Sequence, residues 1–191
     1  AYSLQGIVAV RNSTLTIEPW TFLIGQPGSQ PPSVLLVTTS GKINAAGTRT
    51  RPIIMTSSLP IGTRQRGDWG GLILLGKAPI NDPAGSLPIE GLPDAPDTRF
   101  GGSDPNHSCG SLAYVRVEFA GAQLRPNEET NSFTWGGCGK QTVAHHLEAT
   151  YGFDDSFEWF GGNNDAKYLV GVYGADDYLD VQIGYTGRVQ H

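Results

Sequence analysis

The sequence predicts an all-β protein whose short strands wind into a parallel β-helix, a solenoid of stacked coils. Gly (26 residues) and Pro (13 residues) are frequent and follow no collagen period, which favours many turns joined by short strands. Long helices are disfavoured because no stretch keeps apolar residues at helical spacing without an intervening Gly or Pro. A repeat and an alternation of residue types then specify the solenoid.

The repeat gives the length of one coil. Residues 144–165 (AHHLEATYGFDDSFEWFGGNND) align with residues 166–187 (AKYLVGVYGADDYLDVQIGYTG), so the offset from 144 to 166 is 22 residues. Both segments contain Tyr-Gly-x-Asp-Asp. A period in the low twenties without a helix is typical of one coil of a β-solenoid. A leucine-rich repeat has a similar period, but its Leu/Asn ladder is absent.

The alternation identifies the strands. Val115 and Val117 alternate with Arg116 and Glu118, so one side of this strand is predicted to be buried and the other to face water. Runs of Val, Ile, Leu and Thr broken by Gly, Asn or Pro predict further strands within residues 15–17, 34–37, 41–48 and 51–58. We expect about six to eight coils in a single domain that spans residues 1–191.

Two segments interrupt the repeat. Residues 76–108 are rich in Pro, Gly and Asp, and residues 122–131 form a shorter excursion. A loop as long as the first one is unusual in a compact domain and is either functional or a cover. We expect both insertions to leave from corners of the coils and to wall a groove on one face.

The two cysteines, Cys109 and Cys138, lie in Gly- and Ser-rich sequence, which favours a disulfide between them, although two buried free thiols remain an alternative. A bridge across about 30 residues stabilises the fold by about 3–4 kcal/mol on the loop-entropy model. It also implies an oxidising compartment.

Six runs of sequence form a recognisable set: Leu-Thr-Ile-Glu-Pro (15–19), Gly-Lys-Ile-Asn-Ala-Ala-Gly-Thr (41–48), Pro-Ile-Ile-Met-Thr-Ser (52–57), Gly-Asp-Trp-Gly-Gly-Leu-Ile (67–73), Tyr-Val-Arg-Val-Glu-Phe-Ala-Gly (114–121) and Asp-Asp-Ser-Phe-Glu-Trp-Phe-Gly-Gly (154–162). Together they resemble a known family, the bacterial secreted right-handed parallel β-helix proteins of the pectin-lyase-like superfold. The resemblance covers nearly the whole chain. It implies secretion or display on a bacterial cell surface, but no particular activity. Trp20 departs from the family pattern, since a turn Gly is commoner there.

The repeat also stacks acidic residues on neighbouring coils. Adjacent coils are about 4.8 Å apart, and carboxylates at such a short separation repel one another. Ca²⁺ takes six to eight oxygen ligands and would offset this repulsion. The predicted metal ligands are Asp154, Asp155, Glu158, Asp176, Asp177 and Asp180.

Two alternatives to a metal site stay open for the acidic residues. Asp155 and Asp177 would cap turns through backbone N–H groups, as a repeated corner requires, but capping does not explain Glu158 and Asp180. A shared proton would instead leave an acid beside a base, as in glycosidases. The candidate catalytic residues are Asp155, Asp177 and Arg188. The His and Arg/Lys elements that accompany an Asp-Asp pair in polygalacturonase-like enzymes are missing.

Aromatic residues are candidates for stacking on sugars. Trp69 lies between glycines, and Trp69 and Trp135 are the predicted ligand-binding residues. Trp159 is predicted to be core because its position in the strand alternation points inward.

Three classes of function fit these features. The first is an extracellular scaffold or glycan-binding adhesion module, with Ca²⁺ as a candidate stabilising ion. The second is a carbohydrate-active enzyme, either a polysaccharide lyase or a glycoside hydrolase. The third is a structural subunit that assembles through an open last coil, because 181–191 is predicted to be strand to its end.

The composition limits the partners. A polysaccharide or cell-surface glycan is expected, whereas the net charge of −5 disfavours nucleic acid. No apolar run reaches the roughly 20 residues of a membrane span.

Overall fold

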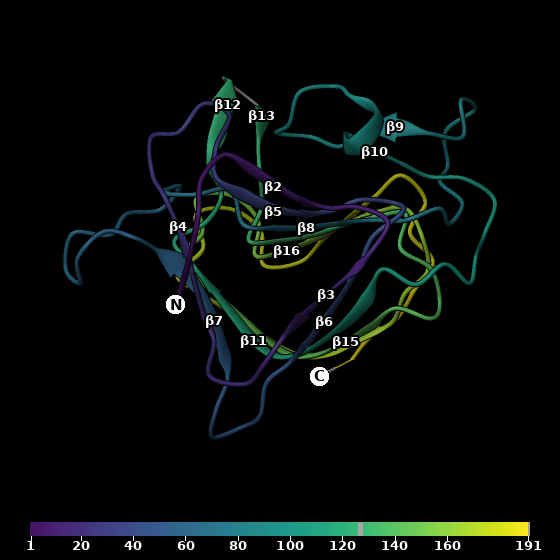
Figure 1. Cartoon of the computed structure of the whole chain (residues 1–191). Coiled ribbons are helices and arrows are strands. Elements are labelled where there is room, and N and C mark those ends of the chain that lie inside the picture. The colour runs from purple at the N-terminus through teal and green to yellow at the C-terminus, as the bar shows by residue number, and fades with distance from the viewer. Residues whose placement is uncertain (126–127, 191) are drawn as a thin grey trace.

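A computed structural model of the chain describes residues 1–125 and 128–190. Its strands stack in parallel into a right-handed β-helix with three faces, which confirms the predicted fold (Figure 1). The strands of successive coils lie behind one another along the sides of a triangle. In the described part of the chain, no helix is long and apolar enough to cross a membrane.

One face of the triangle is a six-stranded sheet with parallel neighbours throughout. Its strands, in order, are β2 (Ile7–Val10), β5 (Val34–Val37), β8 (Leu72–Leu75), β14 (Phe133–Gly136), β16 (Phe157–Phe160) and β18 (Asp180–Gln182). Every residue of β5, β8, β14 and β16 is buried. Both faces of these strands are therefore covered: the inner face by side chains of the solenoid core, and the outer face by another part of the chain.

The other two faces belong to one nine-stranded sheet that bends at a corner. Its strands are β1 (Tyr2–Leu4), β3 (Thr14–Ile17), β4 (Phe22–Gly25), β6 (Lys42–Ala46), β7 (Ile53–Ser57), β11 (Gly110–Glu118), β15 (Val143–Thr150), β17 (Ala166–Val172) and β19 (Val189–Gln190). The first half of β11 pairs with β6 and its second half with β7, so one long strand spans two faces.

Aromatic side chains mark the corners at the ends of these half-strands. They form two stacks along the solenoid: Tyr114–His146–Tyr168 and Phe119–Tyr151–Tyr173. Neighbouring ring centroids are 4.4 to 5.1 Å apart. Each of these residues has a positive φ, a conformation that costs a non-glycine residue about 1–2 kcal/mol. The stacking contacts offset part of that cost. Trp20 (φ 69°) is in the same conformation, which explains why a glycine is common at this turn.

The 22-residue repeat is the true offset between the last coils. Asp177 lies 22 residues after Asp155, and the Asp155 side chain is hydrogen-bonded to the Asp177 backbone across coils. The preceding step, from Asn131 to Asp155, is 24 residues. The interior continues the stacking, since Trp135 lies 4.8 Å from Trp159 between ring centroids. The prediction that Trp159 is core is confirmed, because it is fully buried.

The segment of residues 76–108 leaves the coil between β8 and β11 and folds over the outer side of the six-stranded sheet (Figure 1). It contains β9 (Leu87–Pro88), a 3₁₀ turn η1 (Pro96–Thr98) and β10 (Arg99–Phe100), which pairs antiparallel with β9. Its apolar side chains pack on outward-facing residues of the sheet in a second core: Val34, Leu36, Ile73, Leu75, Ile89, Leu92, Phe100 and Phe160. This layer is what covers the sheet from outside.

The segment of residues 122–131 leaves the next corner as an antiparallel hairpin of β12 (Gln123–Arg125) and β13 (Glu128–Glu129), which rises above the same sheet (Figure 1). Residues 126–127 lie outside the described part of the chain.

The last coil departs from the prediction of continuous strand over 181–191. A turn at Ile183–Gly184 separates β18 from β19, because both residues have positive φ. His191 lies outside the described residues. Leu179 and Val181, in the last coil that the structure describes, are half exposed (50% and 54%). Self-assembly through this end stays a prediction.

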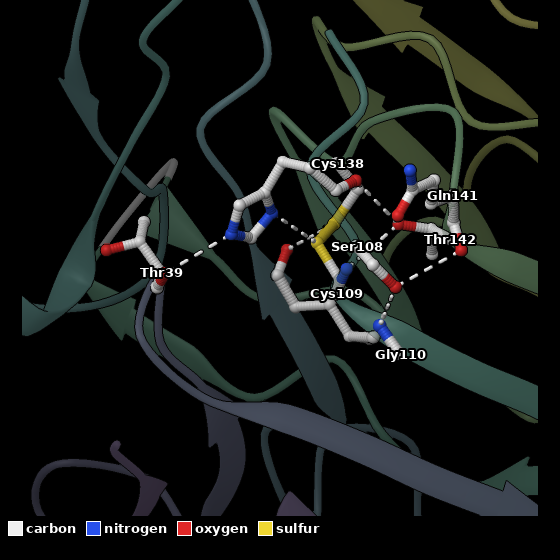
Figure 2. The surroundings of a disulfide bond; sticks show 9 residues. Thr39, Ser108, Cys109, Gly110, Cys138, Gln141 and Thr142 are labelled. Carbon is white, nitrogen blue, oxygen red and sulfur yellow. Dashed lines mark hydrogen bonds between the residues drawn. A yellow bond between two sulfur atoms is a disulfide. The ribbon is translucent and has the colours of Figure 1, made fainter. Parts of the chain in front are cut away.

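Cys109, just before β11, and Cys138, just after β14, form the predicted disulfide, with Cα atoms 5.8 Å apart (Figure 2). Both cysteines are fully buried. The Thr142 hydroxyl accepts a hydrogen bond from the Cys109 backbone N–H at 3.0 Å. The bridge joins the end of the first insertion to the coil that follows the second insertion, and it is consistent with an oxidising compartment.

Candidate functional site

A cleft of about 440 Å³ lies between the two insertions on the outer side of the six-stranded sheet. One wall is the segment of residues 88–94, the other is the hairpin, and Phe160 and Gln182 line the cleft from the last two coils. Arg125 and Glu128 of the hairpin form an exposed ion pair at 3.6 Å on the second wall. The cleft is therefore the place where both insertions and the terminal coils meet.

The predicted acidic residues gather beside this cleft. Their carboxylates form two groups in which each residue offers an oxygen within 4.8 Å of those of the others, and Asp155 belongs to both. The groups are Asp154–Asp155–Asp176 and Asp155–Glu158–Asp180. Asp177 belongs to neither group and is exposed. Five of the six predicted metal ligands are thus brought together.

Asx side chains form a ladder across three coils at this corner. The Asn131 side-chain oxygen accepts a hydrogen bond from the Asp155 backbone N–H (3.1 Å), and the Asp155 carboxylate accepts one from the Asp177 N–H (3.0 Å). Capping by Asp155 therefore reaches the next coil rather than its own turn.

Glu158 is held at the centre of the cluster. Its strand position points away from the coil interior, yet only 3% of the residue is exposed, because neighbouring groups cover it. One carboxylate oxygen accepts a hydrogen bond from the Asn131 amide, and the other accepts one from the Gln182 amide at 2.7 Å. The Asn131 amide is oriented by its bond to Asp155, so its NH₂ group must face Glu158. Two amide donors suit a charged carboxylate.

Burial and repulsion act against that charge. Burial, followed by repulsion from Asp155 and Glu90, raises the pKa of Glu158 to about 9. Burial and the neighbouring Asp154 raise the pKa of Asp155 to about 7. Burial and Glu129 raise the pKa of Asp154 to about 6. The cluster therefore needs either protons or a cation near neutral pH.

A further oxygen lies beside Glu158. Thr134 is the register partner of Glu158 on the adjacent strand β14, so both side chains project from the same side of the sheet. Thr134 is 2% exposed, and its hydroxyl has no hydrogen-bond partner among the described residues. Carboxylates with a hydroxyl are a donor set for a hard cation such as Ca²⁺.

The fold agrees with the family to which the sequence is similar. The whole chain, residues 1–191, matches the family described as the pectate-lyase-like β-helix domain. It belongs to that family. No curated protein and no solved structure matches the chain.

The prediction that Trp69 and Trp135 of this pectate-lyase-like β-helix domain bind a ligand is wrong. Trp69 and Trp135 are both fully buried, so neither indole can stack on a sugar in a surface groove. Trp135 stacks inside the coil, and Trp69 packs closely over the backbone of Gly25 while its indole N–H donates to the Glu118 carbonyl at 2.8 Å. The glycines around Trp69 permit close backbone approach rather than exposure.

The three candidate catalytic residues are not assembled. Asp155 and Asp177 are neighbours in the ladder, but Arg188 lies just before β19, in the other sheet, where its guanidinium pairs with Asp165 at 2.6 Å. Arg188 is committed to that carboxylate.

Four residues of the site were missed from sequence: Glu90, Glu129, Asn131 and Gln182. Asn131 had a signal, because Asn-Ser-Phe at 131–133 matches Asp-Ser-Phe at 155–157. Glu90 and Glu129 sit in the insertions, where no repeat could align them.

Proposed function

We propose that this chain is an extracellular β-helix scaffold that binds a glycan in the cleft between its insertions, with Ca²⁺ held by the adjacent acidic cluster. The observation that carries the proposal is the position of Gln182. Its amide donates to Glu158 at 2.7 Å and to Asp180 at 2.8 Å, and the same side chain lines the cleft. Protonation of the acidic cluster, or a cation bound there, therefore changes the hydrogen bonds of Gln182, a residue that lines the cleft.

Calcium is favoured over shared protons by the hydrogen bonding of Glu158. Both of its oxygens accept from amides, the arrangement of a carboxylate, although burial opposes a carboxylate there. A divalent cation restores the charge balance and takes the carboxylates of Asp155, Glu158 and Asp180 with the hydroxyl of Thr134 as ligands. Family membership and the disulfide support a carbohydrate-related, extracellular role in general terms.

A carbohydrate-active enzyme, either a polysaccharide lyase or a glycoside hydrolase, is the second candidate. It is favoured by carboxyl groups whose pKa values are pushed apart, to about 7 for Asp155 and about 9 for Glu158, as in acid–base pairs. Against it, a general acid must reach its substrate, and Glu158 is 3% exposed.

The test combines cation binding with glycan binding. Calorimetry should detect Ca²⁺ binding to the protein, and a panel of oligosaccharides should be bound with Ca²⁺ and released by EDTA. Asp180→Asn should abolish both signals, whereas Glu18→Gln, a matched loss of one exposed acid in the first coil, should change neither. Glycan binding that is unaffected by EDTA would refute the role of the cation. Release of sugar ends from a polysaccharide, lost in Asp155→Asn, would establish the enzyme instead.

A further inference from the structure

Two adjacent histidines lie on the outer side of the nine-stranded sheet, at one of the aromatic corners of β15. Consecutive residues of a strand normally point to opposite sides. Here Ala144 and Leu147 are both buried, although they are three positions apart, because the positive φ of His146 (53°) interrupts the alternation. The side chains of His145 and His146 therefore both lie outside the coil interior, and each residue is partly buried.

The two imidazole rings face each other through the same kind of atom. The Nδ1 atoms of His145 and His146 are 2.9 Å apart, and the ring planes are at 85° to one another. Burial, followed by the neighbouring His146 and Lys167, lowers the pKa of His145, so this ring is neutral at pH 7. A neutral imidazole is the form that binds a metal ion.

Tyrosine rings hold the histidine pair in place. Tyr114 stacks on His146 with ring centroids 4.4 Å apart, and it meets His145 edge-on at 6.3 Å. From the next coil, Tyr168 lies 4.5 Å from His146 between ring centroids. The His146 ring is thus held by aromatic contacts from two neighbouring coils. Such a preorganised side chain loses little conformational entropy when a ligand binds.

The distance between the two nitrogens favours one type of metal. With metal–nitrogen bonds of about 2.0 Å, ligands at the right angle of a square-planar site are about 2.8 Å apart, and ligands at a tetrahedral angle are about 3.3 Å apart. The observed 2.9 Å matches the first arrangement. Cu²⁺ and Ni²⁺ adopt such sites with nitrogen ligands, and Cu²⁺ binds more tightly of the two. Ca²⁺ takes oxygen ligands, so the pair is not a second calcium site.

One nearby charge opposes a cation at this corner. Lys167 is the register partner of His145 on the adjacent strand, so both side chains project from the same side of the sheet. Lys167 is exposed, and its ammonium lies 5.5 Å from the centre of the Tyr168 ring, so solvent and the ring weaken its effect on the pair. Within the described part of the chain, neither a carboxylate nor a further imidazole joins the pair in a group of three ligands.

We propose that His145 and His146 chelate Cu²⁺ through their two Nδ1 atoms, at a site separate from the acidic cluster. The ring that carries its proton on Nδ1 changes to the Nε2–H tautomer, which frees both nitrogen lone pairs. A small rotation of each ring then directs the lone pairs at one ion, and water completes the coordination. The site depends neither on Ca²⁺ nor on a glycan, because its ligands are nitrogens on the other sheet.

The experiment titrates the protein with Cu²⁺ in excess Ca²⁺, follows binding by calorimetry and examines the bound ion by pulsed electron paramagnetic resonance. One ion should bind with two imidazoles as ligands. His145→Gln and His146→Asn should each weaken binding by at least about tenfold and leave at most one imidazole on the ion. Asn is chosen at position 146 because it tolerates a positive φ.

His107→Gln is the matched control. The ring nitrogens of His107 contact the Thr39 carbonyl oxygen and the Cys109 sulfur rather than a second imidazole. This variant should therefore change the affinity for Cu²⁺ by less than about twofold. Melting temperatures of all the variants, measured without Cu²⁺, verify that each one folds.

The outcomes separate this site from the acidic cluster. A single imidazole on the ion in the parent protein, or a loss in His107→Gln as large as in the other two variants, would overturn the inference. Loss of Cu²⁺ binding in Asp180→Asn, with both histidines present, would also overturn it, because the ion would then lie in the acidic cluster. Binding of Cu²⁺ that survives Asp180→Asn and is lost in the His145 and His146 variants would support the site. A protein that binds Ca²⁺ but not Cu²⁺ would refute this inference alone.

Discussion

The Asp155 carboxylate accepts a hydrogen bond from the backbone N–H of Asp177, one coil further along the solenoid, at 3.0 Å. The Asn131 side chain makes the same bond to Asp155 itself. The corner thus requires an acceptor oxygen and not a charge, and this distinction yields the first prediction.

Asp155→Asn should leave the fold as stable as the parent or more stable in EDTA, because the amide oxygen keeps the bond and the repulsion from Asp154 is lost. Asp155→Ala removes the acceptor of the part-buried Asp177 N–H and should lower the free energy of unfolding by about 0.5–1.5 kcal/mol. Urea denaturation measures both. Equal destabilisation by the two variants would contradict the ladder.

The stability of the metal-free protein should rise as the pH falls. The folded-state pKa values of Asp154, Asp155 and Glu158, about 6, 7 and 9, lie above the ordinary values of 3.8, 3.8 and 4.5. The folded state therefore binds protons more tightly than the unfolded state does, so stability declines as the pH rises from the ordinary values towards these folded values. Denaturation in EDTA from pH 5 to pH 9 should show this decline. Glu158→Gln should flatten its upper part, and a stability that increases with pH would exclude burial and carboxylate repulsion as the dominant forces in the cluster.

Calcium should reverse that pH dependence. Its carboxylate ligands must lose their protons, so binding should release protons and strengthen as the pH rises. Calorimetry in buffers of different ionisation enthalpy measures the released protons directly. At Ca²⁺ a hundredfold above the dissociation constant, the stability should increase by about 2.7 kcal/mol. Glu18→Gln is the control, and an equal response in the Asp180→Asn variant would place the ion elsewhere.

Tyr151 (φ 56°) tests the aromatic corners, because it lies between Phe119 and Tyr173 with ring centroids 5.1 and 5.0 Å away. Tyr151→Ala loses the stack and keeps the backbone strain, whereas Tyr151→Gly loses the stack and relieves it. The alanine variant should therefore be less stable than the glycine variant by about 1 kcal/mol, the reverse of the usual order in strands. Equilibrium unfolding of the two variants measures the sign of this difference in the free energy of unfolding.

Replacing Cys109 and Cys138 together by Ala should lower the free energy of unfolding by about 3–4 kcal/mol, since the bridge closes a span of 29 residues. Denaturation of the parent with and without reductant is the parallel measurement. A stability that is unchanged in both comparisons would show that the bridge has no such role.

The sequence predicted those features that repeat. The offset between 144–165 and 166–187 placed Asp155 beside Asp177 and Glu158 beside Asp180, and both neighbours are observed. The sequence did not predict that Glu158 is buried. Glu158 points outward as its strand position requires, but Asn131 and Gln182 cover it, and no local pattern records this cover.

The error at Trp69 has a related cause. Adjacent glycines usually mark an exposed turn, but here a Cβ on Gly71 would lie 2.1 Å from the Asn131 carbonyl oxygen. The glycine is required by a backbone 60 residues away in sequence, from 71 to 131, so its role becomes apparent only once the coils are stacked.

The layer formed by residues 76–108 has one more consequence. Val34, Leu36, Ile73 and Leu75 form a flat apolar surface on the outside of the solenoid, and Ile89, Leu92 and Phe100 hide it from water. Without that layer, the sheet would expose a contiguous apolar surface of the kind that causes aggregation. Shortening this segment should therefore harm expression as well as remove one wall of the cleft, and an engineer seeking a smaller scaffold would first have to replace those four sheet residues with polar ones.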